Sequence, residues 1–180
     1  LGMILEGGSI ESDGRGTLLT TSQCLLSPNR NPHLSRGKVE KKLYKWLGAQ
    51  KVLWLDYGYL AGDDTDSHID TLARLCPDHK IAYVACDDPQ DEHYQELLKM
   101  RGQLESFISH RGSPYTLYPL PWPEAVVDEE GQRLPATYAN FLIINGAVLV
   151  PLYEDPKDEE ALKVMKDIFP DREIVGINCR

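Results

Sequence analysis

One stretch of the sequence, GDDTDSHID at residues 62–70, places a single histidine among four carboxylates: Asp63, Asp64, Asp66 and Asp70. A metal ion, a cationic ligand or a solvated loop would each account for so much negative charge. The spacing does not fit an EF-hand calcium loop, because the positions that need glycine and glutamate hold Ile69 and Leu75. No second histidine lies nearby for a transition-metal site. We therefore expect no metal at this stretch.

His68 and Asp70 are the pair best suited to chemistry. We predict a strand over residues 68–75, and two residues spaced by two on a strand point to the same face. A histidine beside a carboxylate can give and take a proton. For Asp63, Asp64 and Asp66 a plain acidic loop in solvent is an equally good interpretation.

Three further stretches contain polar residues that chemistry could use. Glu6 precedes a glycine pair in LEGGS, where glycine permits close approach of the backbone, and a structural bulge is the alternative. We interpret SPNRNPHL, residues 27–34, as a turn. Cys24 has no histidine near it in sequence and lies beside two leucines, so we predict a buried thiol rather than a nucleophile.

Composition limits the class of protein. The chain has 180 residues, 42% of them hydrophobic, which suffices for one domain with a core. Its net charge of −9 argues against a nucleic-acid partner and suits a small cation. No apolar run approaches the roughly 18 residues of a membrane span, and no secretory leader is recognisable. Four scattered cysteines fit reduced thiols. We expect a cytoplasmic protein that binds neither membrane nor nucleic acid.

Three segments repeat one order of elements: strand, turn, strand, helix, strand. They cover approximately residues 1–56, 68–120 and 137–178, with helices expected over 35–47, 89–108 and 156–169. Asp13-Gly14 and Asn145-Gly146 predict hairpins, which a doubly wound parallel sheet would lack. We therefore expect an α/β protein with similar units around an axis. Residues 119–135, rich in proline, interrupt this repeated order of elements and are predicted to be a surface excursion.

Long stretches of the chain resemble the agmatine deiminase and bacterial, Porphyromonas-type, peptidylarginine deiminase family. They are LEGGSIESDGRGTLLTTSQCLLSPNRNP, GDDTDSHIDTLAR and NFLIINGAVLVPLYEDPKDEEAL. The resemblance implies the pentein fold, an α/β propeller of five ββαβ repeats, of which this chain would supply about three. It also implies hydrolysis of a guanidinium to a ureido group with release of ammonia, without metal or organic cofactor. In such enzymes a cysteine thiolate attacks the guanidinium carbon and a histidine transfers protons.

The resemblance also implies roles for individual residues. His68 would be the acid–base residue and Asp70 would bind the guanidinium. Glu6 would orient the histidine or add negative charge. Asp64 or Asp66 would meet the distal amine of a small cationic guanidino substrate.

Two departures from the family pattern bear on activity, and one is that the family's upstream repeat, which supplies a tryptophan and an aspartate to the substrate, is not in this sequence. The family's nucleophilic cysteine lies in a glycine-rich segment that is missing from this sequence, and Cys179 corresponds to the strand before it. We therefore expect a central piece of a longer enzyme, inactive alone and dependent on the remainder of its polypeptide to complete the propeller. Exposed edges of such a piece should favour association, which leaves a homo-oligomer open.

A smaller departure concerns the substrate. Glu11 and Ser67 stand where many agmatine deiminases have other residues. Deimination of agmatine to N-carbamoylputrescine and ammonia, in putrescine synthesis, is the first expectation. Peptidyl or free arginine as the substrate, or a non-catalytic module that binds polyamines or basic peptides, are the alternatives.

Overall fold

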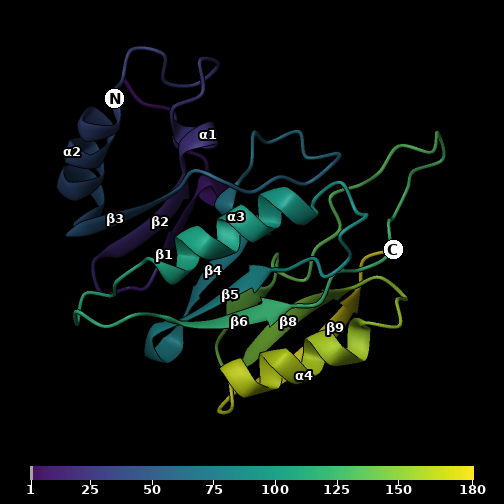
Figure 1. Ribbon diagram of the computed structural model, residues 1–180. Coiled ribbons are helices and arrows are strands. Elements are labelled where there is room, and N and C mark those ends of the chain that lie inside the picture. The colour runs from purple at the N-terminus through teal and green to yellow at the C-terminus, as the bar shows by residue number, and fades with distance from the viewer. Residues whose placement is uncertain (1) are drawn as a thin grey trace.

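The computed structural model describes residues 2–180, and in it three small sheets follow one another along the chain (Figure 1). Each sheet has three strands. Its first two strands form an antiparallel hairpin, and its third strand pairs in parallel with the second after a helical crossover. The α/β class and the three ββαβ repeats are thus confirmed. Closure into a five-repeat propeller, and the description of the chain as one partial propeller domain, stay predictions.

The first repeat contains β1 (Ile10–Ser12), β2 (Thr17–Thr21), α1 (Ser22–Leu25), α2 (Arg36–Leu47) and β3 (Lys51–Leu55). Its hairpin turns at Asp13, whose carboxylate accepts the backbone N–H groups of Arg15 and Thr17. Helix α2 ends at Gly48, which has a φ of 67° and so adopts the left-handed conformation that glycine favours.

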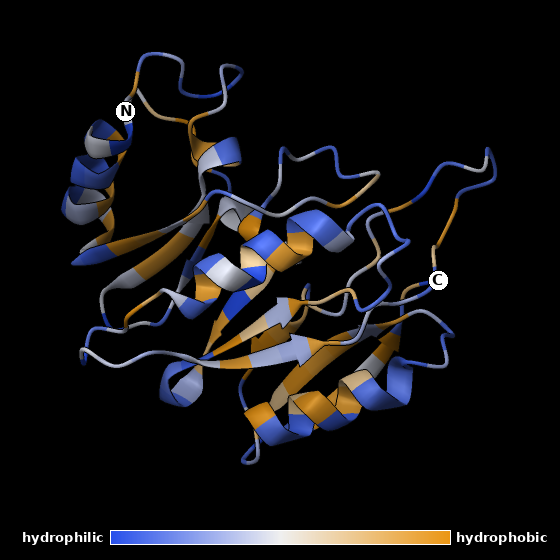
Figure 2. Cartoon of the chain, in the orientation of Figure 1, coloured by the Kyte–Doolittle hydropathy of each residue, from blue (hydrophilic) through white to orange (hydrophobic). Residues whose placement is uncertain are grey.

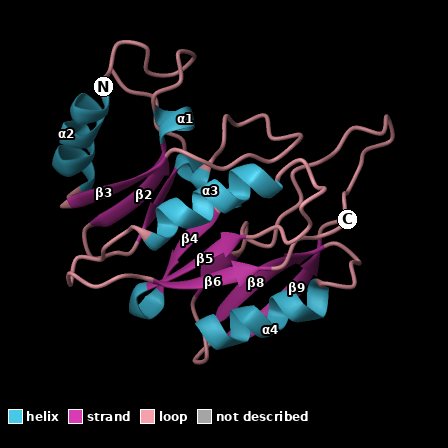
Figure 3. Cartoon of the chain, in the orientation of Figure 1, coloured by secondary structure: helices cyan, strands magenta, loops and turns pink. Residues whose placement is uncertain are grey.

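The second repeat contains β4 (Ala73–Cys76), β5 (Lys80–Val84), α3 (Tyr94–Glu105) and β6 (Thr116–Leu120). The third contains β7 (Leu142–Ile144), β8 (Ala147–Leu152), α4 (Asp158–Ile168) and β9 (Glu173–Asn178). The strands lie inside and the helices lie along their outer side (Figure 3). Helix α3 also contacts β3, and α4 also contacts β6, so these two helices join each repeat to the preceding one.

Several predicted strands and helices are shorter in the structure. The first strand, expected over residues 3–11, begins only at Ile10, because Gly7–Ser9 forms a 3₁₀ turn closed by hydrogen bonds from Ser9 to the Glu6 carbonyl. The strand predicted over 68–75 begins at Ala73, because Ile69–Thr71 is also a 3₁₀ turn. Helix α3 begins at Tyr94 instead of residue 89, because aspartate side chains in the segment before it fold the backbone into turns.

Hydrophobic residues concentrate in the strands and on one side of the helices (Figure 2). A large core runs through all three repeats, from Leu19 in β2 to Met165 in α4, and a smaller core lies beneath α2. The guanidinium of Arg74 links the repeats, because it donates to Glu11 in the first and to the carbonyls of Ala139 and Phe141 beside the third. No helix within residues 2–180 is long and apolar enough to cross a membrane.

Candidate active site

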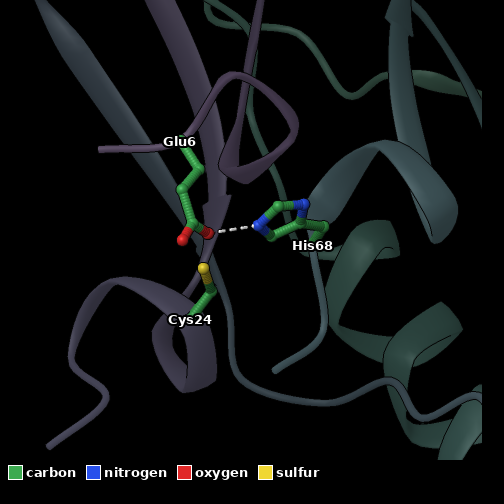
Figure 4. Close-up of side chains that lie close together, drawn as sticks. All are labelled: Glu6, Cys24 and His68. Atoms are coloured by element: carbon green, nitrogen blue, oxygen red, sulfur yellow. Dashed lines mark hydrogen bonds and ion pairs between the residues drawn. The ribbon is translucent and has the colours of Figure 1, made fainter. Parts of the chain in front are cut away.

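Glu6 and His68 meet at one end of the strands, although they are 62 positions apart in sequence (Figure 4). Glu6 directly precedes the turn Gly7–Ser9, and His68 directly precedes the turn Ile69–Thr71. His68 Nε2 lies 2.5 Å from Glu6 Oε2. A carboxylate only accepts hydrogen bonds, so this contact assigns a proton to Nε2. The lone pair on Nδ1 is then free to take a proton from another group.

Gly8 is the point at which the side chains of His68 and Asp70 converge. A Cβ atom added at Gly8 would lie 2.6 Å from His68 Nδ1 and 2.8 Å from Asp70 Oδ2. The two side chains therefore do lie together, as expected, but the 3₁₀ turn brings them there, because neither residue belongs to a strand. The absence of a side chain at Gly8 leaves the room that both occupy.

Asp70 is half-buried beside charged neighbours. Burial raises the pKa of its carboxyl, and the positive charge of Arg74 partly offsets that effect. Arg74 is itself paired with Glu11 at 2.8 Å, and both side chains are nearly buried. Glu11, one of the departures from the family pattern, is thus the partner of the arginine behind Asp70.

Arg30 is the site residue that the sequence analysis missed. Its Nε donates to Glu6 Oε2 at 3.0 Å, Nη1 to Asp66 Oδ2 at 2.5 Å, and Nη2 to the Thr65 carbonyl at 2.9 Å. The hydrogen bond from Arg30, followed by that from His68, holds the pKa of Glu6 below its ordinary value. Residues 27–34 do form turns, but they also place a cation against the Glu6–His68 pair.

The neighbouring Asn31 is the residue in the sequence that could have indicated that this turn packs against another segment. Its side-chain amide donates to the carbonyls of Ile4 and Leu25, and its oxygen accepts the Ile4 N–H. Asn31 is buried, so these bonds fix the turn to the segment that carries Glu6. A buried asparagine in an Asn-rich turn usually satisfies backbone groups in this way.

The acidic loop 62–70 uses its carboxylates in different ways. Asp63 accepts from the N–H and hydroxyl of Thr65 and from the Ser67 N–H at 2.6 Å, so it shapes the loop. Asp66 pairs with Arg30, and Asp64 is exposed. The structure therefore brings His68, Asp70 and Glu6 together, places Asp66 on the far side of Arg30, and leaves Asp64 facing solvent.

Cys24 completes the group drawn in Figure 4. Glu6, Cys24 and His68 each present a ligand-type atom within 4.8 Å of the others, which is a spacing that a metal could exploit. The residues fit a metal poorly, however. The Arg30 cation already pairs with Glu6, so a second cation at the same carboxylate would be repelled. Burial also raises the pKa of the Cys24 thiol to about 11, so a metal would have to displace a tightly held proton. The prediction of a buried thiol is confirmed, because Cys24 is fully buried.

Comparisons with known proteins agree on one family. The family model for Porphyromonas-type peptidyl-arginine deiminase matches residues 1–180. An agmatine deiminase from Pseudomonas savastanoi is 37% identical over 97% of this chain and 52% of its own length. The crystal structure of a putative arginine deiminase from Porphyromonas gingivalis is 56% identical, with a TM-score of 0.96 over 100% of this chain and 53% of that one.

A further solved structure holds a ligand. It is a C. jejuni agmatine deiminase with substrate bound, 44% identical, with a TM-score of 0.90 over 98% of this chain and 51% of that one. The present chain thus spans about half the length of the curated relatives it matches. Their similarity extends over nearly all of the residues described here.

Proposed function

Because this chain belongs to the Porphyromonas-type peptidyl-arginine deiminase family, we propose that it forms part of an enzyme that hydrolyses the guanidinium of agmatine. The products would be N-carbamoylputrescine and ammonia. The observation that carries this proposal is the Glu6–His68 pair, with Asp70 against the same glycine. The comparisons add agmatine, since several relatives are agmatine deiminases.

The geometry supports a proposed role for each of the three side chains. A guanidinium is planar and always charged, and a carboxylate such as that of Asp70 can accept its N–H groups. His68 Nδ1 borders the same space, since it and Asp70 both lie within 3 Å of the position of a Gly8 Cβ. A proton on Nδ1 can therefore pass to a departing ammonia, and the emptied lone pair can then take a proton from water. Glu6 accepts the hydrogen of the opposite ring nitrogen and so holds the ring in this tautomer and orientation.

We place the nucleophile outside residues 2–180. Cys24 is fully buried with a raised thiol pKa, so it does not supply a thiolate. Cys179 is exposed at the opposite end of the chain from the elements that carry Glu6 and His68. The relatives are about twice as long as this chain, which leaves ample sequence for a cysteine and for further repeats.

Asp64 is the better of the two candidates for the distal amine of agmatine. It is exposed on the acidic loop, whereas the Asp66 carboxylate is already neutralised by Arg30 at 2.5 Å. Peptidyl-arginine is the second candidate substrate, because the matching family model describes peptidyl-arginine deiminases. Putrescine synthesis, a cytoplasmic location and association into oligomers stay predictions.

Ammonia release by the full-length protein tests the proposal. Agmatine and an arginine-containing peptide are offered separately, to wild type, His68→Ala and His33→Ala. His33 is an exposed histidine of the first repeat and serves as the matched control. We expect release from agmatine that His68→Ala abolishes and His33→Ala leaves intact.

Two other outcomes of this assay would favour the alternative functions. Release from the peptide alone would move the assignment to peptidyl-arginine. Binding of agmatine or a polyamine by wild type without any ammonia would favour the non-catalytic module.

A further inference from the structure

The predicted excursion after β6 folds back over the loop that carries His68. At Gly62, the first residue of that loop, an added Cβ would lie 2.0 Å from the Arg133 carbonyl oxygen. The two backbones are therefore in direct contact. A small pocket lined by residues 60–61, His93 and the excursion lies at this contact. An excursion that extended into solvent would not make such a close backbone contact with this loop.

His93 stands at the centre of this contact. Its ring is buried, with 1% of the residue exposed. The backbone N–H of Ala61 donates to its Nε2 at 2.8 Å, so Nε2 is an acceptor, and the proton of the neutral ring lies on Nδ1. Nδ1 donates to Asp91 Oδ1 at 2.5 Å. One imidazole thus connects the start of the site loop to the segment before α3.

Trp122 and Arg133 bind the excursion to the same aspartate. Trp122 Nε1 donates to Asp91 Oδ2 at 3.0 Å, and Arg133 lies 3.5 Å from that oxygen. Burial acts to raise the pKa of Asp91, but hydrogen bonds from His93 and Trp122 outweigh it and hold the pKa at about 2. Asp91 is therefore ionised at neutral pH. We call Asp91, His93, Trp122 and Arg133 the His93 clamp.

Hydrogen bonds continue from the clamped end of the loop to His68. Asp63 accepts from the Thr65 hydroxyl and from the Ser67 N–H, and the Thr65 hydroxyl accepts the His68 N–H at 3.1 Å. Asp66 and Ser67 both have positive φ, so this loop holds a conformation that non-glycine residues seldom adopt alone. Hydrogen bonds to Asp63 within the loop, and from Arg30 and Thr21 outside it, hold this conformation at its far end, and the contacts of Ala61 and Gly62 fix its start.

We propose that the His93 clamp positions the loop 62–68, and that the excursion after β6 is therefore part of the active-site framework. The clamp residues touch no reacting group in this scheme and act through the loop. The proposal rests on the proposed deiminase function for its kinetic readout. Its structural readout is independent of that function.

The test compares Gly62→Ala with Gly131→Ala in the full-length protein. Both glycines have nearly the same φ, +81° and +79°, so the backbone strain of alanine is matched. Gly131 lies in the excursion but has nothing within 4 Å of an added Cβ. We expect Gly62→Ala to lower kcat/KM by about ten-fold or more, because small displacements of catalytic groups are that costly. Gly131→Ala should stay near wild type.

His93 variants separate positioning from general stability. His93→Gln retains an acceptor at the place of Nε2, whereas His93→Asn retains only the donor toward Asp91. With kcat and KM measured well below Tm, we expect Gln to preserve most activity and Asn to lose it. Equal kinetics for Gly62→Ala and Gly131→Ala would overturn the proposal.

If the wild type proves inactive, amide hydrogen exchange at residues 63–68 tests whether the His93 clamp positions the loop. Faster exchange there in Gly62→Ala than in Gly131→Ala supports the clamp without reference to catalysis. Identical exchange in the two variants refutes it, even if the deiminase function holds.

Discussion

Gly8 offers a direct test of the site geometry, since one methyl group should disturb two of the proposed catalytic side chains, His68 and Asp70, at once. Neither Gly8 nor its neighbour Gly7 needs a positive φ, so alanine fits the backbone at both positions. An added Cβ at Gly8 would lie 2.6 Å from His68 Nδ1 and 2.8 Å from Asp70 Oδ2. At Gly7 it would meet nothing within 4 Å. Gly7→Ala is therefore a matched control in the same 3₁₀ turn.

The size of the effect follows from these distances. Ordinary van der Waals contact begins near 3.4 Å, so His68 Nδ1 and Asp70 Oδ2 must each move by roughly 0.6–0.8 Å. Displacements near 1 Å cost catalysis about 100-fold, which corresponds to about 2.7 kcal/mol in the transition state. Side chains rotate more easily than backbone moves, so folding stability should change by less than about 1 kcal/mol.

Steady-state ammonia release from agmatine by the full-length protein is the assay. We expect kcat/KM to fall by about 100-fold in Gly8→Ala and by less than about two-fold in Gly7→Ala, with similar Tm in both. Equal activity in the two variants would show that His68 and Asp70 do not need the geometry described here. A large loss of Tm in Gly8→Ala alone would instead make Gly8 a folding residue.

Three further predictions concern charges and thiols near the site. Arg30→Met should lower the free energy of unfolding by about 2 kcal/mol, because it removes hydrogen bonds to two carboxylates from a guanidinium that is itself largely buried. The matched change Arg36→Met breaks a pair whose arginine is exposed and should cost under about 1 kcal/mol. Equal losses in urea titrations would contradict the site's electrostatics. The hydrogen bond from Arg30 is the main cause of the lowered pKa of Glu6, so the stability that this pair contributes is complete above pH 4.5, the ordinary pKa, and is lost as pH falls through the lowered pKa. The difference in unfolding free energy between wild type and Arg30→Met should therefore narrow below pH 4.5. A difference that does not change with pH would refute this prediction. In native protein at pH 8, iodoacetamide should label Cys179, which is exposed, and should not label Cys24, whose thiol is buried with a pKa of about 11. Mass spectrometry measures the labelling of both residues. Rapid labelling of Cys24 would contradict the buried-thiol interpretation.

Local signals predicted most of the scaffold. Asp13-Gly14 and Asn145-Gly146 mark the hairpins that form, and Gly48 marks the end of α2. Helix boundaries before α3 were misplaced, since Asp88 can close a turn as well as cap a helix. The two 3₁₀ turns at Gly7–Ser9 and Ile69–Thr71 were predicted as strand, because short apolar runs do not distinguish extended backbone from a tight turn.

The sequence by itself determined the family, the ββαβ repeats and the candidacy of Glu6, His68 and Asp70, because these depend on periodicity, turn chemistry and short motifs. Only the tertiary structure decided how those side chains meet. Arg30 joins Glu6 across 24 positions and His68 joins it across 62, and no local pattern specifies contacts at such separations. The turn over residues 27–34 folds back on the Glu6 segment within the first repeat, and the packing of the first two repeats against each other brings His68 to the same carboxylate. The excursion after β6 meets the loop that carries His68 through a separate contact, between Arg133 and Gly62.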